Sequence, residues 1–147
     1  MKKLLLLLLF GASLIAHEII VKESSCSVDN TMQKIESAIK ARGHTVFTVI
    51  DHQKNANSVD MIMPPSKLII FGNPRIGTNA MLSEMKVGLD LPMKILVYKD
   101  ADSKVKIAYR NATWIAKKYN LSITTREAKV NKALDKVTTK AGQCIKD

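Results

Sequence analysis

The chain has 147 residues, of which 46% are hydrophobic and 24% are charged. This is the size and composition of one globular domain, and it excludes a repeat or low-complexity protein. The 23 basic and 13 acidic residues give a net charge of +10. A charge of this sign favours anionic partners such as lipid headgroups, acidic ligands or nucleic acid.

The first 16 residues have the layout of a secretory signal peptide. Lys2 and Lys3 form a positive start, and an apolar run of residues 4–16 follows. The run is shorter than the roughly 20 residues of a membrane-spanning helix, and it contains no cysteine for a lipid anchor. We therefore expect cleavage after Ala16, with Ser13 as an alternative, and no integral membrane span afterwards.

Export determines which partners are expected. A periplasmic or secreted protein does not meet cytoplasmic nucleic acid, so we expect no nucleic-acid partner despite a mature net charge of +8. Export also places Cys26 and Cys144 in an oxidising compartment, where a pair of cysteines commonly forms a disulfide. The sequence leaves open whether these two residues lie close enough to pair.

The first half of the chain predicts a strand, a helix and further strands. Residues 18–22 are β-rich, and Ser27 is suited to cap a helix that ends before Gly43. The apolar residues of this helix repeat at spacings of four, three and four: Val28, Met32, Ile35 and Ile39. Residues 45–51, 58–63 and 67–71 read as extended segments, the last two separated by Pro64 and Pro65.

The second half predicts a turn, a hairpin and helices. Gly72-Asn73-Pro74 is a turn signal, and residues 79–85 suit a short helix. Residues 93–98 and 105–109 flank a turn and predict a hairpin, and Asn111 suits the start of a helix over residues 111–119. A capping box at Thr124 and Glu127 precedes an apolar stripe that predicts a final helix: Val130, Leu134, Val137, Ala141 and Cys144.

This order of elements predicts an α+β fold. A strand, a helix, four strands and then helices imply a mainly antiparallel sheet with the helices packed on one face. We expect a signal peptide over residues 1–16, an α+β domain over 17–121 and a C-terminal amphipathic helix extension over 122–147. The basic side of that helix is a further candidate surface for anionic lipid.

Catalytic motifs are few. The sequence has no Gly-x-Ser-x-Gly, His-Glu-x-x-His or Cys-x-x-Cys pattern, and the loop at Gly72 lacks the lysine of a phosphate-binding loop. His52 is the main candidate for acid-base chemistry, with Asp51 or Asp90 as its carboxylate. A small hydrolase or isomerase is thus one alternative, but a non-enzymatic module fits the sequence better.

Methionines suggest a second alternative. Met61 and Met63 are spaced for one face of a strand, and Met81 and Met85 for one helical turn. Thioethers together with His52 would suit Cu(I), although methionine is also a common core residue. Metal and cofactor identity therefore stay open.

The chain resembles the family known as domain of unknown function 302. The resemblance spans residues 18–121 and is carried by the segments 27–52, 68–78, 88–98 and 100–109, above all Phe-Gly-Asn-Pro ending at Pro74 and Leu-Asp-Leu-Pro ending at Pro92. It implies a strand-helix-four-strand-helix fold and a homodimer, and supplies no activity. The site residues to which it directs attention are His52, Asn73, Met81 and Asp90, which we expect to border one ligand-binding cleft. The leading interpretation is an exported, non-enzymatic ligand-binding or interaction module.

Overall fold

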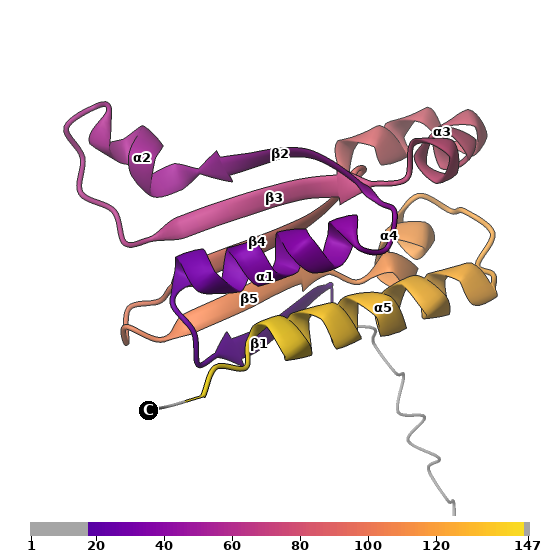
Figure 1. The fold of residues 1–147 in the computed structure, drawn as a ribbon. Coiled ribbons are helices and arrows are strands. Elements are labelled where there is room, and N and C mark those ends of the chain that lie inside the picture. Colours follow the sequence, from indigo (N-terminus) through magenta and orange to yellow (C-terminus); the bar gives the residue numbers. More distant parts are fainter. Residues whose placement is uncertain (1–17, 146–147) are drawn as a thin grey trace, which may run out of the picture.

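The computed structural model describes residues 18–145, which form one five-stranded sheet and its helices (Figure 1). The strands are β1 (Ile19–Ser24), β2 (Thr45–Asp51), β3 (Ser66–Gly72), β4 (Met93–Lys99) and β5 (Val105–Arg110). The helices are α1 (Val28–Lys40), α2 (His52–Asn57), α3 (Pro74–Ser83), α4 (Ala112–Lys118) and α5 (Thr125–Ala141), with a 3₁₀ turn, η1 (Met85–Leu89). The predicted α+β class is confirmed.

All neighbouring strands are antiparallel, in the order β1-β5-β4-β3-β2. The N-terminal strand thus closes one edge of the sheet by pairing with β5, although the two are far apart in sequence. At the opposite edge, the pairing of β2 with β3 shifts between Val46 and Thr48, so Phe47 occupies a β-bulge. Phe47 is 48% exposed at this point, close to where β3 ends.

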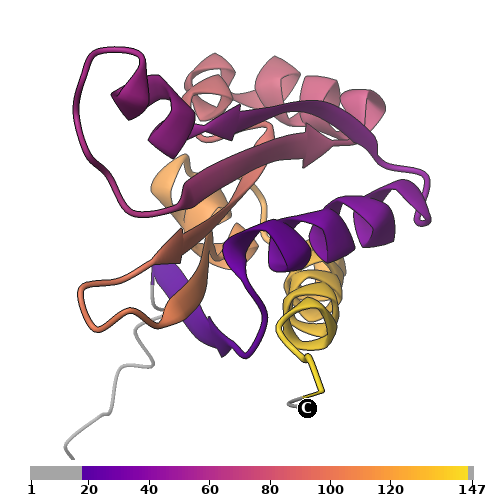
Figure 2. The same ribbon diagram turned by 60° about the vertical axis from the view of Figure 1, so that its left-hand side comes forward.

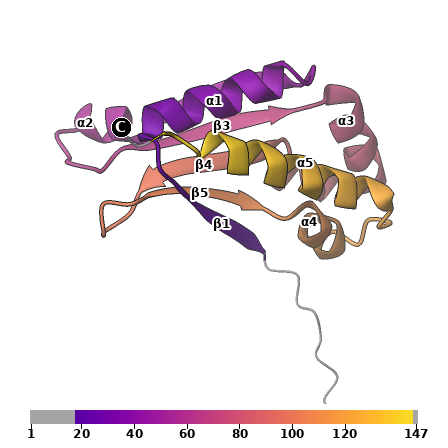
Figure 3. The same ribbon diagram turned by 60° about the horizontal axis from the view of Figure 1, so that its bottom comes forward.

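Helices α1 and α5 cover one face of the sheet and lie side by side (Figures 2 and 3). Their apolar stripes meet the alternate strand residues that point towards them, which gives one core. Ile35, Ile69, Ile95 and Ile107 are fully buried there. Leu134 and Val137 of α5 belong to the same core, so the helix expected as an extension after residue 121 packs as an integral layer of the domain.

The two long helices begin where their capping residues predict. The Ser27 side chain accepts a hydrogen bond from the backbone N–H of Asn30, and Thr124 and Glu127 form the expected capping box of α5. Gly43 adopts a positive φ of 72° just after α1, the conformation for which glycine is suited. Helix α1 therefore starts and stops on local signals alone.

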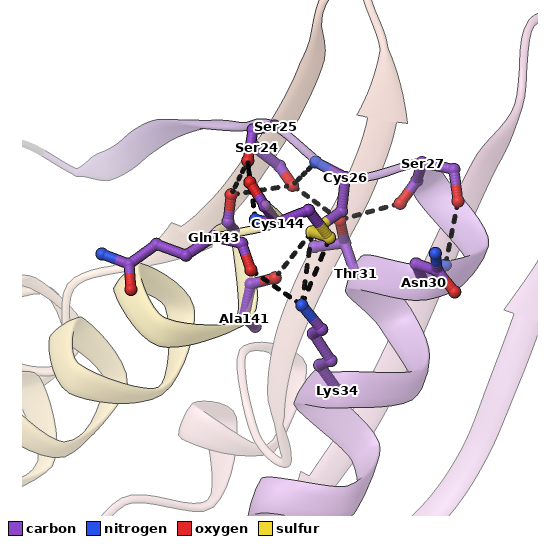
Figure 4. The surroundings of a disulfide bond; sticks show 11 residues. Ser24, Ser25, Cys26, Ser27, Asn30, Thr31, Lys34, Ala141, Gln143 and Cys144 are labelled. Atoms are coloured by element: carbon purple, nitrogen blue, oxygen red, sulfur yellow. Dashed lines mark hydrogen bonds between the residues drawn. A yellow bond between two sulfur atoms is a disulfide. The ribbon is translucent and has the colours of Figure 1, made fainter. Parts of the chain in front are cut away.

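Cys26 and Cys144 lie at bonding distance, with their sulfurs 2.04 Å apart. The bond joins the start of α1 to the chain just beyond α5 (Figure 4). The Lys34 ammonium donates to the backbone carbonyl of Gln143 at 2.7 Å and lies 3.2 Å from the Cys144 sulfur. The pairing that the sequence left open is thus present, and because it joins the start of α1 to the end of α5, the two neighbouring helices are antiparallel.

Two local predictions were wrong. Residues 58–63 form no strand but a turn and an irregular segment, and α2 occupies residues 52–57 because the Asp51 side chain caps it through the backbone N–H of Lys54. The segment expected as a turn at Asn73 is the cap of α3, which begins at Pro74 rather than at residue 79. Pro74 suits that first helical position because its missing N–H would be unpaired there in any case. Within residues 18–145, none of the helices is both long and apolar enough to cross a membrane.

Candidate functional site

A cavity of about 440 Å³ lies at the end of the sheet where β3 stops and β4 starts. Its floor includes Phe71 and Ile95, and one wall is the first half of α5, with Val130 and Leu134. Helix α4 contributes Ile115 to another wall. These side chains come from elements far apart in sequence, so only the complete fold builds the cavity.

The third wall is α3, which is held loosely. None of its residues is buried, and the element it mainly contacts is the short turn η1. Ile76, Ala80 and Met81 nevertheless line the cavity. Met81 rests on Gly88, where a Cβ atom would come within 2.9 Å of its terminal methyl group. Helix α3 therefore covers one side of the cavity, and its Met81 side chain contacts Gly88 of η1; α3 is called the cover below.

Most of the lining is apolar, and its polar side chains are few. Apart from threonine, they are Arg42, His44, Asn73, Arg126 and Glu127. Asn73 Oδ1 accepts from the backbone N–H groups of Arg75 and Ile76, at 3.0 and 3.4 Å. The Asn73 oxygen is thus engaged in capping α3, and its main effect on the cavity is to fix the position of that cover.

The Glu127 side chain is likewise engaged in capping a helix, in this case α5. Its carboxylate accepts from the backbone N–H of Thr124 at 2.7 Å and from the Thr124 hydroxyl at 3.0 Å. Burial opposes its ionisation, but these hydrogen bonds more than compensate and hold the pKa of Glu127 below its ordinary value. Glu127 is therefore ionised at neutral pH, and its negative charge faces the N-terminus of α5.

The side chains of Arg42, His44 and Arg126 have nitrogen atoms that are still available for hydrogen bonds. Arg42 donates one hydrogen bond to the Ala38 carbonyl at 2.9 Å. The ion pairs between residues 18 and 145 involve neither Arg42 nor Arg126. In the same part of the chain, His44 Nδ1 is the buried side-chain nitrogen that has no hydrogen-bond partner. An unpaired buried polar atom is uncommon, because its desolvation goes uncompensated.

A second polar cluster surrounds Asp90, just before β4. The Asp90 carboxyl side chain is 10% exposed and contacts Tyr119 Oη at 2.6 Å, Lys118 Nζ at 3.0 Å and Arg110 Nε at 3.3 Å. Burial raises the pKa of Asp90, but the hydrogen bonds from Tyr119 and Lys118 and the charges of Lys118 and Lys94 outweigh it, so the pKa is lowered. The Arg110 and Lys118 cations also lie 5.1 and 4.9 Å from the Trp114 ring centre.

Asp90 borders a smaller cleft of about 210 Å³, together with Lys94 and Arg110. Burial lowers the pKa of Lys94, and the nearby Asp90 charge opposes this shift only in part. The Lys94 ammonium donates to the backbone carbonyls of Asp90 and Pro92, at 3.3 and 3.0 Å. The contacts of Lys94, like those of Asp90, therefore hold the loop before β4 in place.

The four residues singled out from the sequence do not share one cleft. Asn73 and Met81 line the large cavity, and Asp90 lies in the smaller one. His52 begins α2 at the far end of β2, and a strand of seven residues spans about 20 Å. The expected common cleft therefore reduces to Asn73 and Met81.

This separation bears on both alternatives. A hydrolase or isomerase would need His52 beside Asp90, which lies at the other end of the sheet, or beside Asp51, whose carboxylate caps α2 and pairs with Lys67 at 3.3 Å. Copper binding would need His52 together with Met81, and these are likewise apart. In the part of the chain from 18 to 145, no group of three His, Cys, Asp or Glu side chains is arranged for a metal ion.

Sequence reasoning did not place Arg42, His44 and Arg126 at a common site, although it counted Arg126 on the basic side of the last helix. Arg42 and His44 flank Gly43 at the end of α1, and Arg126 is in the first turn of α5. A cation at the start of a helix is disfavoured by the helix dipole, so Arg126 was a recognisable local signal. That Arg126 lines the same cavity as Arg42 follows only from the antiparallel packing of α1 and α5.

The fold and cavity define a class of compact α+β domain with a five-stranded antiparallel sheet. A family model described as "Domain of unknown function DUF302" matches residues 20–141. The chain belongs to this family, which confirms the resemblance seen in the sequence.

A solved structure agrees. The crystal structure of an uncharacterized conserved DUF302 protein from Bacillus stearothermophilus superposes with a TM-score of 0.71 at 18% identity, covering 87% of this chain and 100% of that one. At that identity the likeness concerns the fold.

Curated relatives are longer. Two proteins named fluoride-specific ion channel FluC 1, from Brucella suis biovar 1 and Brucella abortus biovar 1, are each 35% identical over 114 residues. The match covers 78% of this chain but only 45% and 42% of those proteins. The chain thus spans less than half the length of these relatives.

Proposed function

We propose that this protein is an exported, non-enzymatic module that binds a mainly apolar small molecule between α3, α4 and α5. The observation that carries the proposal is the cavity of about 440 Å³ at the end of the sheet. Small-molecule sites are typically cavities of about 300–1,000 Å³ with mostly apolar walls and a few polar groups. The size and lining of this cavity fit that description.

The loosely held α3 supports a binding role. A ligand must enter the apolar space beneath α3, and a cover with few buried contacts opens at low cost in free energy. Helix α3 has no buried residue, whereas α5 contributes to the core and α4 buries Ile115 and Ala116. The cover is thus the least stably attached of the three cavity walls.

Export is supported by two features. Residues 1–16, which lie outside the described residues, have the composition of a signal peptide. The Cys26–Cys144 pair fits an oxidising compartment. Expression of the full chain with fractionation tests this part: recovery of a cleaved form in the periplasm or medium supports it, and an uncleaved cytoplasmic protein contradicts it.

Binding is tested with a neutral fluorescent probe, 1-N-phenylnaphthylamine, added to the mature protein. Ala133 and Ala128 are both exposed on α5, but of the two only Ala133 lines the cavity. Ala133→Trp should place a large ring at the cavity and abolish probe binding, whereas Ala128→Trp should bind like the wild type. No probe binding by the wild type, or equal binding by both variants, would contradict the proposal.

Native mass spectrometry of protein purified from its host without reduction extends this test. A bound species of a few hundred daltons would support the proposal and give the ligand mass. The same spectrum reports the homodimer expected from the family resemblance, as twice the mass of the chain. A ligand that stays bound to Ala133→Trp would mean that it lies elsewhere.

A further inference from the structure

We infer that the ligand is a single-chain amphiphile whose alkyl chain fills the cavity and whose anionic oxygen head, a carboxylate or a phosphate, is bound by Arg42 and Arg126. This inference rests on the proposed function and names the class of molecule that the cavity takes. It follows from how the polar groups are distributed around the apolar walls, from their charges, and from which of them already have partners.

The apolar part of the cavity would hold the alkyl chain. Its floor and walls are made of branched and aromatic side chains such as Phe71, Ile115 and Leu121, and removing an alkyl chain from water into such surroundings is favourable. These walls provide few hydrogen-bonding partners. A ligand polar along its whole length would therefore lose hydration without replacement.

The charged groups come from two helix ends at the same end of the domain. Helices α1 and α5 are antiparallel neighbours, so the end of α1, with Arg42, lies at the same end of the sheet as the start of α5, with Arg126. Both arginines line the cavity and are exposed. A guanidinium group binds a carboxylate or phosphate with paired, charge-assisted hydrogen bonds.

The balance of charge at this end favours an anion. Of the acidic side chains between residues 18 and 145, only Glu127 lines the cavity, and its Oε2 atom accepts both hydrogen bonds from Thr124. Neither arginine has a carboxylate partner in this part of the chain. The unpaired Nδ1 of His44 lies at the same helix end as Arg42. An anionic head would give the two arginines a hydrogen-bonding partner of opposite charge, which the ion pairs of this part of the chain do not supply.

The test measures displacement of the neutral probe by three ligands with the same alkyl chain: dodecanoate, dodecyl phosphate and dodecanol. We expect the wild-type mature protein to bind an anionic ligand at least about tenfold more tightly than dodecanol, since charge-assisted hydrogen bonds are roughly twice as strong as neutral ones. The preference should shrink as salt is added, because the arginines are exposed. The tighter of the two anions identifies the head group.

The double variant Arg42→Gln/Arg126→Gln should lose this preference while binding the probe and dodecanol normally. The matched control, Lys129→Gln/Lys132→Gln, removes the same charge from exposed α5 positions that do not line the cavity. Equal affinity of the wild type for dodecanol and both anions, or an equal loss in the two double variants, would overturn the inference. Failure of the wild type to bind the probe at all would instead contradict the proposed function.

Discussion

The Tyr119 hydroxyl donates a 2.6 Å hydrogen bond to the carboxylate of Asp90, 29 residues earlier in the chain. The bond ties the loop before β4 to the end of α4. Both segments also line the large cavity, the loop with Leu91 and the helix with Ile115. Asp90 thus sits outside the cavity but fixes the relative position of two of its walls.

Asp90→Asn should therefore destabilise the protein by about 1–3 kcal/mol, the cost of disrupting hydrogen bonds to a largely buried charged group. The pKa of Asp90 is lowered in the folded state. Its stabilising contribution is thus present above the ordinary value of 3.8 and is lost as the pH falls below it through the folded pKa. Urea unfolding of the wild type should show this acid loss, and Asp90→Asn should show less of it. An equal acid response of both proteins would contradict the assignment.

The Cys26–Cys144 bond closes a loop between residues 118 positions apart. In the chain-entropy model a loop of this length contributes about 4–5 kcal/mol, because the crosslink restricts the unfolded chain. Cys26→Ser/Cys144→Ser should lower the free energy of unfolding by up to that amount. Dithiothreitol should reproduce the effect in the wild type and leave the variant unchanged; stability unaffected by either treatment would contradict the pairing.

Helix α3 should exchange its amide hydrogens faster than α1 or α5, because it has no buried residue and opens locally. Met81→Ala removes the side chain that rests on Gly88 and should increase exchange in α3 and η1 further. Exchange in α1 should stay at the wild-type rate. Hydrogen-deuterium exchange by mass spectrometry measures all three segments in one experiment, and uniform protection of α1 and α3 would show that α3 is not a loose cover.

Much of the fold could be predicted because its signals are local. Ser27 and Gly43 mark the ends of α1, and Thr124 with Glu127 marks the start of α5, through bonds made within one turn. The apolar spacing of each long helix then gives the face that packs on the sheet. Where two local signals compete, prediction failed: residues 58–63 are rich in apolar side chains, but the Asp51 cap starts α2 just before them.

The site was less predictable because its residues are brought together by topology. Asn73 and Met81 were found through motifs, and both line the cavity. Arg42 and Arg126 lie 84 positions apart in sequence and share an end of the domain only because α1 and α5 are antiparallel. His52 carries the residue type expected of a site, but the direction of β2 takes it to the far end of the sheet. Residue type alone could not reveal that separation.

The positions of Asn73 and His52 lead to opposite expectations for ligand binding. Asn73→Ala removes the cap of α3, which costs about 1 kcal/mol of helix stability. Because α3 closes the cavity, probe binding should weaken by up to about fivefold. His52→Ala should leave binding unchanged, since His52 is about 20 Å from the cavity along β2. Titration of both variants with 1-N-phenylnaphthylamine measures the difference. A loss of binding in His52→Ala but not in Asn73→Ala would place the ligand at the α2 end of the sheet instead.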